Sequence, residues 1–196
     1  MRLKSLALPS SEGFAANRAA HLEALRRIEE AAALAVEAIK HPKFRYIRLE
    51  RQLQDPLYDD GFAELQGQGF AQLAEGTDVV ICACGYLVHK ALKAQEILAQ
   101  QGVSAGVIDL FRLKPVDGKA IVNVLAEYGA ILTVEEQLLE GGFGSMVAEM
   151  LVDQGVMKPM KRLGLKDGFE VVNGDRDTLH DIYGIDTPHI VEAALA

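Results

Sequence analysis

Cysteine is scarce in this sequence: the chain has two, Cys82 and Cys84, in the stretch DVVICACG. Residues two apart in a β-strand face the same side and lie about 6.6 Å apart, near the limit of disulfide geometry. No further cysteine or histidine accompanies the pair at the spacing of a metal site. We therefore expect neither a disulfide nor a zinc or redox site, and interpret the pair as small buried side chains in a core strand.

Long apolar runs and an excess of basic charge are also missing. No nearly apolar stretch is long enough to span a bilayer. The opening residues, MRLKSLALPSSEGFAA, lack the continuous apolar region of a signal peptide. The formal net charge of −8 disfavours broad contact with nucleic acid or an anionic membrane. We therefore expect a cytoplasmic protein that binds neither, which leaves room for a local basic site.

What the sequence does have is a regular alternation of apolar strands and amphipathic helices after Thr77. The chain of 196 residues, 49% of them hydrophobic, can bury a core. Asp117 and Thr187 are placed to cap two helices, with Pro188 at a first helical position. The alternation predicts an α/β fold, a mostly parallel sheet in three layers. The expected strands are 78–84, 104–111, 130–136 and 160–165, and the expected helices are 86–102, 116–129, 142–155, 177–184 and 187–196.

The first 76 residues do not follow this alternation. Residues 21–40 have an Ala-rich helical pattern, 44–50 a strand pattern, and 52–61 the Pro and DDG signals of a connector. One helix and one strand cannot bury a core alone. We therefore divide the chain into the end of another domain or a docking arm, a linker and an α/β domain, with the ranges 1–51, 52–76 and 77–196.

Five motifs in a fixed order carry a family resemblance: EGTDVVICACG, GVIDLFRLKPVD, LTVEEQLLEGGFGS, GLKDGF and YGID. The set resembles the C-terminal domain of the transketolase superfamily. That superfamily includes transketolase, 1-deoxyxylulose-5-phosphate synthase and the β subunits of 2-oxo acid dehydrogenases. The resemblance covers roughly Phe44 to the end of the chain. It implies a structural and dimerising part of a transketolase-like enzyme, which transfers a two-carbon ketol unit between sugar phosphates.

The resemblance also implies where the cofactor is held. In that family two other domains bind thiamine diphosphate and a divalent metal, magnesium. Their diphosphate motif, GDG followed by an Asn, is absent from this sequence, and the catalytic glutamate belongs to the pyrimidine-binding domain. Residues 21–40 and the stretch FRYIRLER resemble the end of that pyrimidine-binding domain. The resemblance therefore implies no catalytic, cofactor-binding or metal-binding residue here, no activity of this chain alone, and a partner that is either a second copy or the upstream domains or subunit.

The stretch GGFG contains Gly141, Gly142 and Gly144 at the expected start of a helix. Exposed N–H groups at such a start favour an anion such as phosphate. A tight strand-to-helix turn also requires glycine, for positive φ or for close packing. The spacing matches neither a P-loop nor GxGxxG, and the preceding acids, including Glu135 and Glu140, would repel a phosphate. We favour a structural turn in which Glu135 accepts N–H bonds from the backbone.

The remaining acidic residues and histidines do not suggest a catalytic group. Glu135 and Glu136 are adjacent in a strand, so they point to opposite faces and do not form an acid–base pair. Some relatives carry a histidine where this chain has Gln137. The histidines are dispersed and are expected on helix surfaces or in packing, with only His89 near the carboxyl edge of a strand. They are His21, His41, His89, His180 and His189.

Two positions bear on the branch of the family and on its substrate. Phe111 stands where synthase-type and dehydrogenase-type relatives often carry arginine, which favours the transketolase branch. In transketolases an L-x-R-Q stretch supplies an arginine to the sugar phosphate, and Arg51 matches it, although the neighbouring Glu50 opposes a phosphate. An exposed linker arginine is the other interpretation. For the whole chain the alternatives are the C-terminal part of a 1-deoxyxylulose-5-phosphate synthase or a 2-oxo acid dehydrogenase β subunit, and a non-catalytic assembly module or phosphate-binding domain.

Overall fold

The computed structural model of the protein describes residues 35–36, 38–48, 55–58, 67–168 and 172–196. The chain divides into two compact units, residues 1–64 and 65–196. In the first unit, residues 35–36 and 38–40 are helical, and most of the helix expected at 21–40 lies outside the described residues.

The strand expected at 44–50 is not formed by its described residues, 44–48. Side chains here are strongly exposed, with Phe44 at 101% and Tyr46 at 85%. A strand needs a neighbouring strand to supply its hydrogen bonds, and the pattern of alternating side chains does not replace one. This correction concerns secondary structure alone, and the boundaries at 51 and 76 remain predictions.

The second unit is built on five strands: β1 (Ala71–Ala74), β2 (Val79–Ala83), β3 (Ala105–Asp109), β4 (Ala130–Leu138) and β5 (Met160–Leu165). They form one sheet in the order β1-β3-β2-β4-β5. Strands β2, β3, β4 and β5 are parallel, and β1 pairs antiparallel with β3 at one edge. The expected α/β class with a mostly parallel sheet is therefore confirmed.

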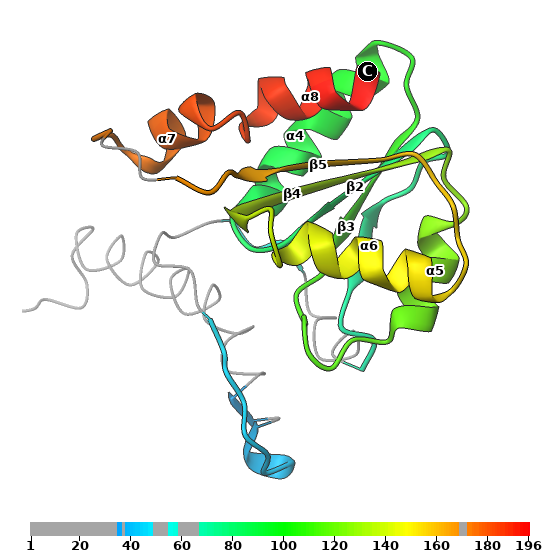
Figure 1. The fold of residues 1–196 in the computed structure, drawn as a ribbon, viewed down its shortest axis with the longest axis vertical. Coiled ribbons are helices and arrows are strands. Elements are labelled where there is room, and N and C mark those ends of the chain that lie inside the picture. Colours follow the sequence, from blue (N-terminus) through cyan, green and yellow to red (C-terminus); the bar gives the residue numbers. More distant parts are fainter. Residues whose placement is uncertain (1–34, 37, 49–54, 59–66, 169–171) are drawn as a thin grey trace, which may run out of the picture. The chain divides into compact units, whose positions relative to one another are not determined.

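Helices cover both faces of this sheet (Figure 1). One face carries α4 and α8, which pack on each other, and the other carries α5 and α6. The short helix α7 lies between β5 and α8 in the chain. The bounds are α4 (Leu87–Gln100), α5 (Gly118–Leu125), α6 (Phe143–Asp153), α7 (Arg176–Ile182) and α8 (Thr187–Leu195).

Local capping explains where two of the helices begin. The Asp117 carboxylate accepts the N–H of Ala120 at 2.9 Å, so the expected cap of α5 is confirmed. At α8 the expected cap, Thr187, is the first helical residue, and the cap is Asp186, which accepts the N–H of His189. A carboxylate is the stronger acceptor near a helix start because it also meets the positive end of the helix dipole.

Strand β1 lies within residues 52–76, which the sequence analysis assigned to a linker. Its four residues, AQLA, carry little β-propensity, so nothing local marks them as a strand. Antiparallel pairing with β3, in which Ala71 lies opposite Asp109, gives the segment its conformation.

The core is densest around the two central strands, since every residue of β2 and β3 is buried. Burial raises the pKa of the Cys82 thiol to about 12, so this side chain stays neutral and packs as a small apolar group. Cys84 is half-buried, and neither cysteine forms a disulfide. Across the described ranges, no helix combines the length and the apolar character that crossing a membrane requires.

Candidate functional site

Strand β4 ends at the carboxyl edge of the sheet, where the chain turns into α6. The buried side chain of Glu135 accepts N–H bonds from the first residues of that helix, at 2.5 Å from Phe143 to Oε2 and 2.8 Å from Gly144 to Oε1. These are bonds that the sequence analysis expected. N–H groups at a helix start lack partners within the helix and attract anions. The carboxyl group of Glu135 therefore occupies the position that an external anion would take.

The first two glycines of the turn are required for different reasons. Gly141 has φ of +70°, a left-handed conformation that favours glycine. Gly142 has φ of −81°, which any residue adopts. A Cβ at Gly142, however, would lie 2.2 Å from Glu135 Oε2 and 2.2 Å from the carbonyl oxygen of Leu138. Close packing, and not backbone strain, therefore requires glycine at position 142.

Side chains around the third glycine close the turn. A Cβ at Gly144 would lie 2.5 Å from Thr133 Oγ1. The Ser145 hydroxyl donates to the carbonyl of Leu139 at 2.7 Å, and Arg162 Nη1 donates at 2.9 Å both to that carbonyl and to Ser145 Oγ. Polar groups from β4, α6 and β5 thus hold the turn in place.

The protonation of Glu135 is set by two opposing effects. Burial raises the pKa of Glu135, and the N–H bonds from Gly144 and Phe143, together with the charge of Arg162, oppose the rise. A buried carboxyl group that is bound in this way supports the structural interpretation of GGFG. The choice between a structural turn and a phosphate-binding turn stays a prediction, tested below by substitution.

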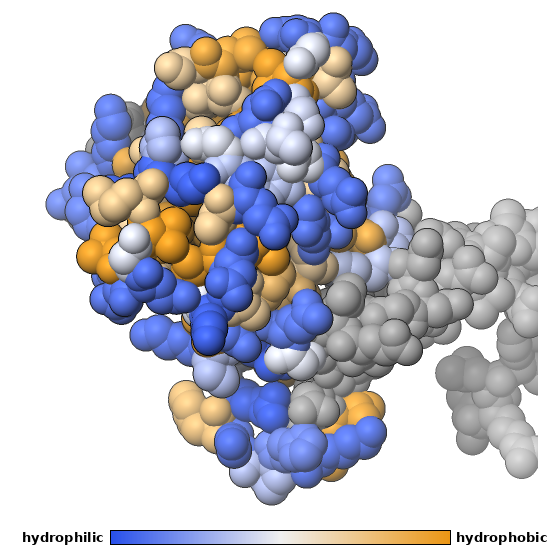
Figure 2. All heavy atoms as spheres, turned by 90° about the vertical axis from the view of Figure 1, so that its right-hand side faces the viewer, coloured by the Kyte–Doolittle hydropathy of each residue, from blue (hydrophilic) through white to orange (hydrophobic). Residues whose placement is uncertain are grey.

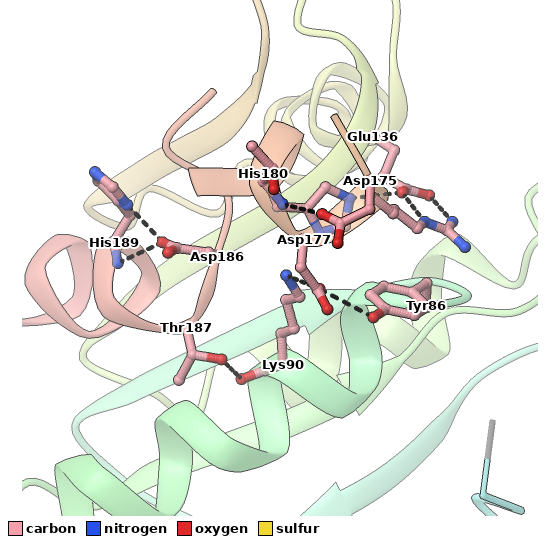
Figure 3. Close-up of polar contacts among 11 residues, drawn as sticks. Tyr86, Lys90, Glu136, Asp175, Asp177, His180, Asp186, Thr187 and His189 are labelled. Carbon is pink, nitrogen blue, oxygen red and sulfur yellow. Dashed lines mark hydrogen bonds and ion pairs between the residues drawn. The ribbon is translucent and has the colours of Figure 1, made fainter. Parts of the chain in front are cut away.

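Its neighbour Glu136 contacts a different set of residues (Figure 3). Arg176 donates to both carboxylate oxygens, from Nε to Oε1 at 2.5 Å and from Nη2 to Oε2. His180 Nε2 lies 2.7 Å from Oε1. Both partners belong to α7. Glu135 and Glu136 therefore serve separate clusters, as expected for adjacent residues of a strand.

The start of α4 supplies the other side of the Glu136 cluster (Figure 3). The hydroxyl of Tyr86 donates to Asp177 Oδ1 at 3.0 Å, and Lys90 Nζ lies 2.8 Å from the same oxygen. Arg176 lies over the face of the Tyr86 ring, 4.1 Å from its centre, and His180 meets that ring in a T-shaped contact at 5.5 Å. The cluster pairs its charges internally and attaches α7 to β4 and α4.

The electrostatics of this cluster favour a charged carboxylate. Burial raises the pKa of Glu136, but the hydrogen bonds of His180 and Arg176 outweigh it and lower that pKa to about 2. Burial and the bond to Asp177 raise the pKa of the Tyr86 hydroxyl. Glu136 is therefore ionised near neutral pH, when it cannot act as a general acid.

Acid should remove the contribution of Glu136 to stability. Its pKa is about 2 in the fold against an ordinary 4.5, so the stabilisation is present above pH 4.5 and is lost as the pH falls through about 2. We expect Glu136 to contribute about 2 kcal/mol to the free energy of unfolding, a value discounted because its side chain is 18% exposed. Urea unfolding should show Glu136→Gln less stable than the parent near neutral pH and similar to it near pH 2. An equal gap at both pH values would contradict this.

Sequence reasoning gave His180 no site role and did not single out four other members of this cluster, Tyr86, Lys90, Arg176 and Asp177. His180 was expected on a helix surface or in packing, and it is 3% exposed and bonded to an acid 44 positions away. No local signal marks such a pairing. His89, expected at the carboxyl edge, lies in α4 and is half-buried. Arg51 lies outside the described residues, so its role remains a prediction.

A third group of polar side chains lies between α7 and α8. The possible ligand atoms of Asp181, Asp186 and His189 all lie within 4.8 Å of one another. Asp186 caps α8, and its Oδ1 lies 2.5 Å from His189 Nδ1. The hydrogen bond to Asp186 raises the pKa of His189. Helix capping explains these contacts, and we assign no metal to the group.

Comparison with known proteins assigns the fold to a family. Residues 69–190 match the family described as transketolase, C-terminal domain. The chain belongs to this family. Its fold is similar to that of a solved split gene transketolase, described as an inactive beta4 tetramer, with a TM-score of 0.60. The two sequences are 35% identical, and the match covers 64% of this chain and 41% of the other. A transketolase mutant from Pichia stipitis, 21% identical, has a TM-score of 0.51 over 68% of this chain and 18% of its own, which shows the fold alone.

Curated relatives of this transketolase C-terminal domain include two kinds of enzyme. The 1-deoxy-D-xylulose-5-phosphate synthase of Aquifex aeolicus is 37% identical over 68% of this chain, and the chain covers 21% of its length. One subunit of the apulose-4-phosphate transketolase of Actinobacillus succinogenes is 31% identical over 77% of this chain and 48% of its own length. The chain thus spans between about a fifth and a half of these relatives.

Proposed function

We propose that this chain is the structural, C-terminal part of a thiamine-diphosphate-dependent transketolase-like enzyme, which transfers a two-carbon ketol unit between sugar phosphates. The observation that carries the proposal is the similarity to one subunit of an apulose-4-phosphate transketolase over 77% of the chain. The fold match with a split gene transketolase supports it. In this proposal the cofactor-binding domains lie upstream, in the same chain or in a partner subunit.

The start of α6, with its glycine-rich turn, does not fit a diphosphate. Glu135 already binds the N–H groups of Phe143 and Gly144, and its negative charge would oppose a second anion. A second carboxylate at this edge, Glu136, is held by Arg176 and His180. Both carboxylates are thus engaged in contacts within the domain, which supports a structural role for this edge. The cofactor chemistry then belongs to the upstream domains.

Exposed apolar side chains support a partner at the first unit. Ile39, Phe44 and Tyr46 are 80%, 101% and 85% exposed, respectively. Aromatic residues of this kind favour protein interfaces. We propose that residues 21–51 dock onto the upstream domain or subunit, and that Arg51 then reaches the phosphate of the sugar. In the second unit apolar groups also reach the surface between polar side chains (Figure 2). Val152 and Met157 are among the exposed apolar residues of this unit. We propose a second copy of the chain as the partner of this unit.

Calorimetry on the chain alone tests whether the cofactor is held by other domains. We expect no tight binding of thiamine diphosphate with magnesium and no turnover of sugar phosphates, because the residues that hold the cofactor belong to other domains. Adding the upstream domains of a transketolase relative should restore both. Micromolar cofactor binding by the chain alone would contradict the proposal. So would the finding that no upstream domain forms a complex with the chain.

A second candidate function is 1-deoxy-D-xylulose-5-phosphate synthesis. Synthase relatives reach 43% identity over 63% of this chain, as in Thermomicrobium roseum, against 31% for the transketolase relative from Actinobacillus succinogenes. The phenylalanine at position 111, which favours the transketolase branch in the sequence analysis, opposes this candidate. Product analysis of the restored enzyme separates the two, since one yields a ketol-transfer product and the other 1-deoxy-D-xylulose 5-phosphate.

A further inference from the structure

Helix α7 is attached to the rest of the unit mainly through polar side chains. Of its seven residues only His180 is buried, with Arg176 and Leu179 half-buried and the others exposed. Apolar burial holds most helices of a globular domain, because it removes a broad apolar stripe from water. A helix whose only buried side chain is an imidazole lacks that stripe.

The attachment converges on one carboxylate. Glu136 accepts two bonds from Arg176 and binds His180, so both inward-facing polar residues of α7 share this acid as a partner. Both also contact the ring of Tyr86. Asp177 adds contacts with Tyr86 and Lys90, but it is 67% exposed and contributes less. Charge-assisted, bidentate bonds are strong only while both partners are present.

The chain on either side of α7 differs in how it is held. After α7, Ile185, Ile190 and Val191 are buried, which anchors α8 by apolar packing. Before α7, the described residues 172–175 are exposed. Release of α7 would therefore leave α8 and the sheet in place, and it would uncover Glu136 and Tyr86 at the carboxyl edge. In α/β sheets this edge is where ligands and partners bind.

We infer that α7 is a strap, latched by Glu136, that opens and closes over the carboxyl edge of β4 without unfolding the domain. The latch is electrostatic, because Glu136 binds Arg176 and His180 through charged hydrogen bonds when the strap is closed. All three side chains become exposed to solvent when the strap opens. Segments of low local stability supply such moving elements in proteins. The strap concerns access to this edge and does not depend on which reaction the complete enzyme performs.

Native-state hydrogen exchange of the full chain in increasing urea tests the strap. The amides of Leu179 and Tyr183, bonded to Asp175 and Leu179 oxygens, report on α7. The amide of Ile131, bonded to Pro159, reports on the sheet. We expect the α7 amides to exchange faster than that of Ile131 and with little dependence on urea, because local opening exposes little surface.

Substitution of the latch supplies the second measurement. Glu136→Gln keeps the shape but removes the charge, and it should accelerate exchange at Leu179 and Tyr183 by about tenfold or more. Glu149→Gln, on the exposed face of α6, is the matched control and should leave both amides unchanged. The strap is overturned if the α7 amides share the rate and urea dependence of Ile131, or if Glu136→Gln leaves their exchange unchanged.

Discussion

Replacing Gly142 with alanine should lower the free energy of unfolding by about 3 kcal/mol. The new methyl group would lie 2.2 Å from both Glu135 Oε2 and the carbonyl oxygen of Leu138. The carbonyl belongs to the backbone and cannot rotate away, and moving Glu135 would break its bonds to the start of α6. Urea unfolding of the chain without any ligand measures the change.

Gly141→Ala is the matched control in the same turn. A Cβ at Gly141 meets no atom within 4 Å, so only the strain of φ at +70° remains, about 1 kcal/mol. The order of the two variants therefore separates close packing from backbone conformation. If GGFG is instead a phosphate site, Gly142→Ala would unfold like the parent and lose affinity for inorganic phosphate, and our structural interpretation would be wrong.

Removing the Glu135 side chain should cost more, about 4 kcal/mol in Glu135→Ala. The substitution leaves the N–H groups of Phe143 and Gly144 without their acceptor in a buried environment and opens a cavity beside Arg162. Thermal and urea unfolding should both show the loss. Part of it should be regained in Glu135→Gln, whose amide oxygen can still accept one of the two bonds.

The control for Glu135 is Glu140→Ala, a substitution of an exposed acid a few residues further along the turn. Surface changes of this kind fall within about 0.5 kcal/mol. Similar losses in the two variants would mean that general charge near the turn matters, and not the hydrogen bonds of Glu135. Stronger phosphate binding by Glu135→Ala, in contrast, would be consistent with our view that Glu135 fills the anion position.

Much of the second unit could be predicted from local sequence. Periodic apolar residues located β2, β3, β4 and β5 and the helices between them, because burial on one or both faces leaves a direct trace in the sequence. Asp117 was predicted as a cap for the same local reason, since a cap bonds to a residue three positions away. Where local signals compete between neighbouring residues, as for Asp186 and Thr187, the sequence alone does not decide.

Elements that depend on a neighbour were harder to predict. The AQLA stretch of β1 has no strand signal and is ordered by its pairing with β3. Residues 44–48 carry the alternating pattern of a strand, and they form no strand in the structure. Hydrogen bonds between strands join residues far apart in the chain, so a sequence pattern can state a preference but cannot supply the partner.

The sequence by itself determined the α/β class and the family, since both rest on local periodicity and on motifs in a fixed order. It also placed Glu135 beside the glycine turn, because acceptor and donors lie only 8 and 9 positions apart. Only the tertiary structure decided that Glu136 meets Arg176 and His180, which lie 40 and 44 positions further on. The physical reason is distance along the chain: these side chains meet only after β5 and the following segment bring α7 back to the carboxyl edge of β4.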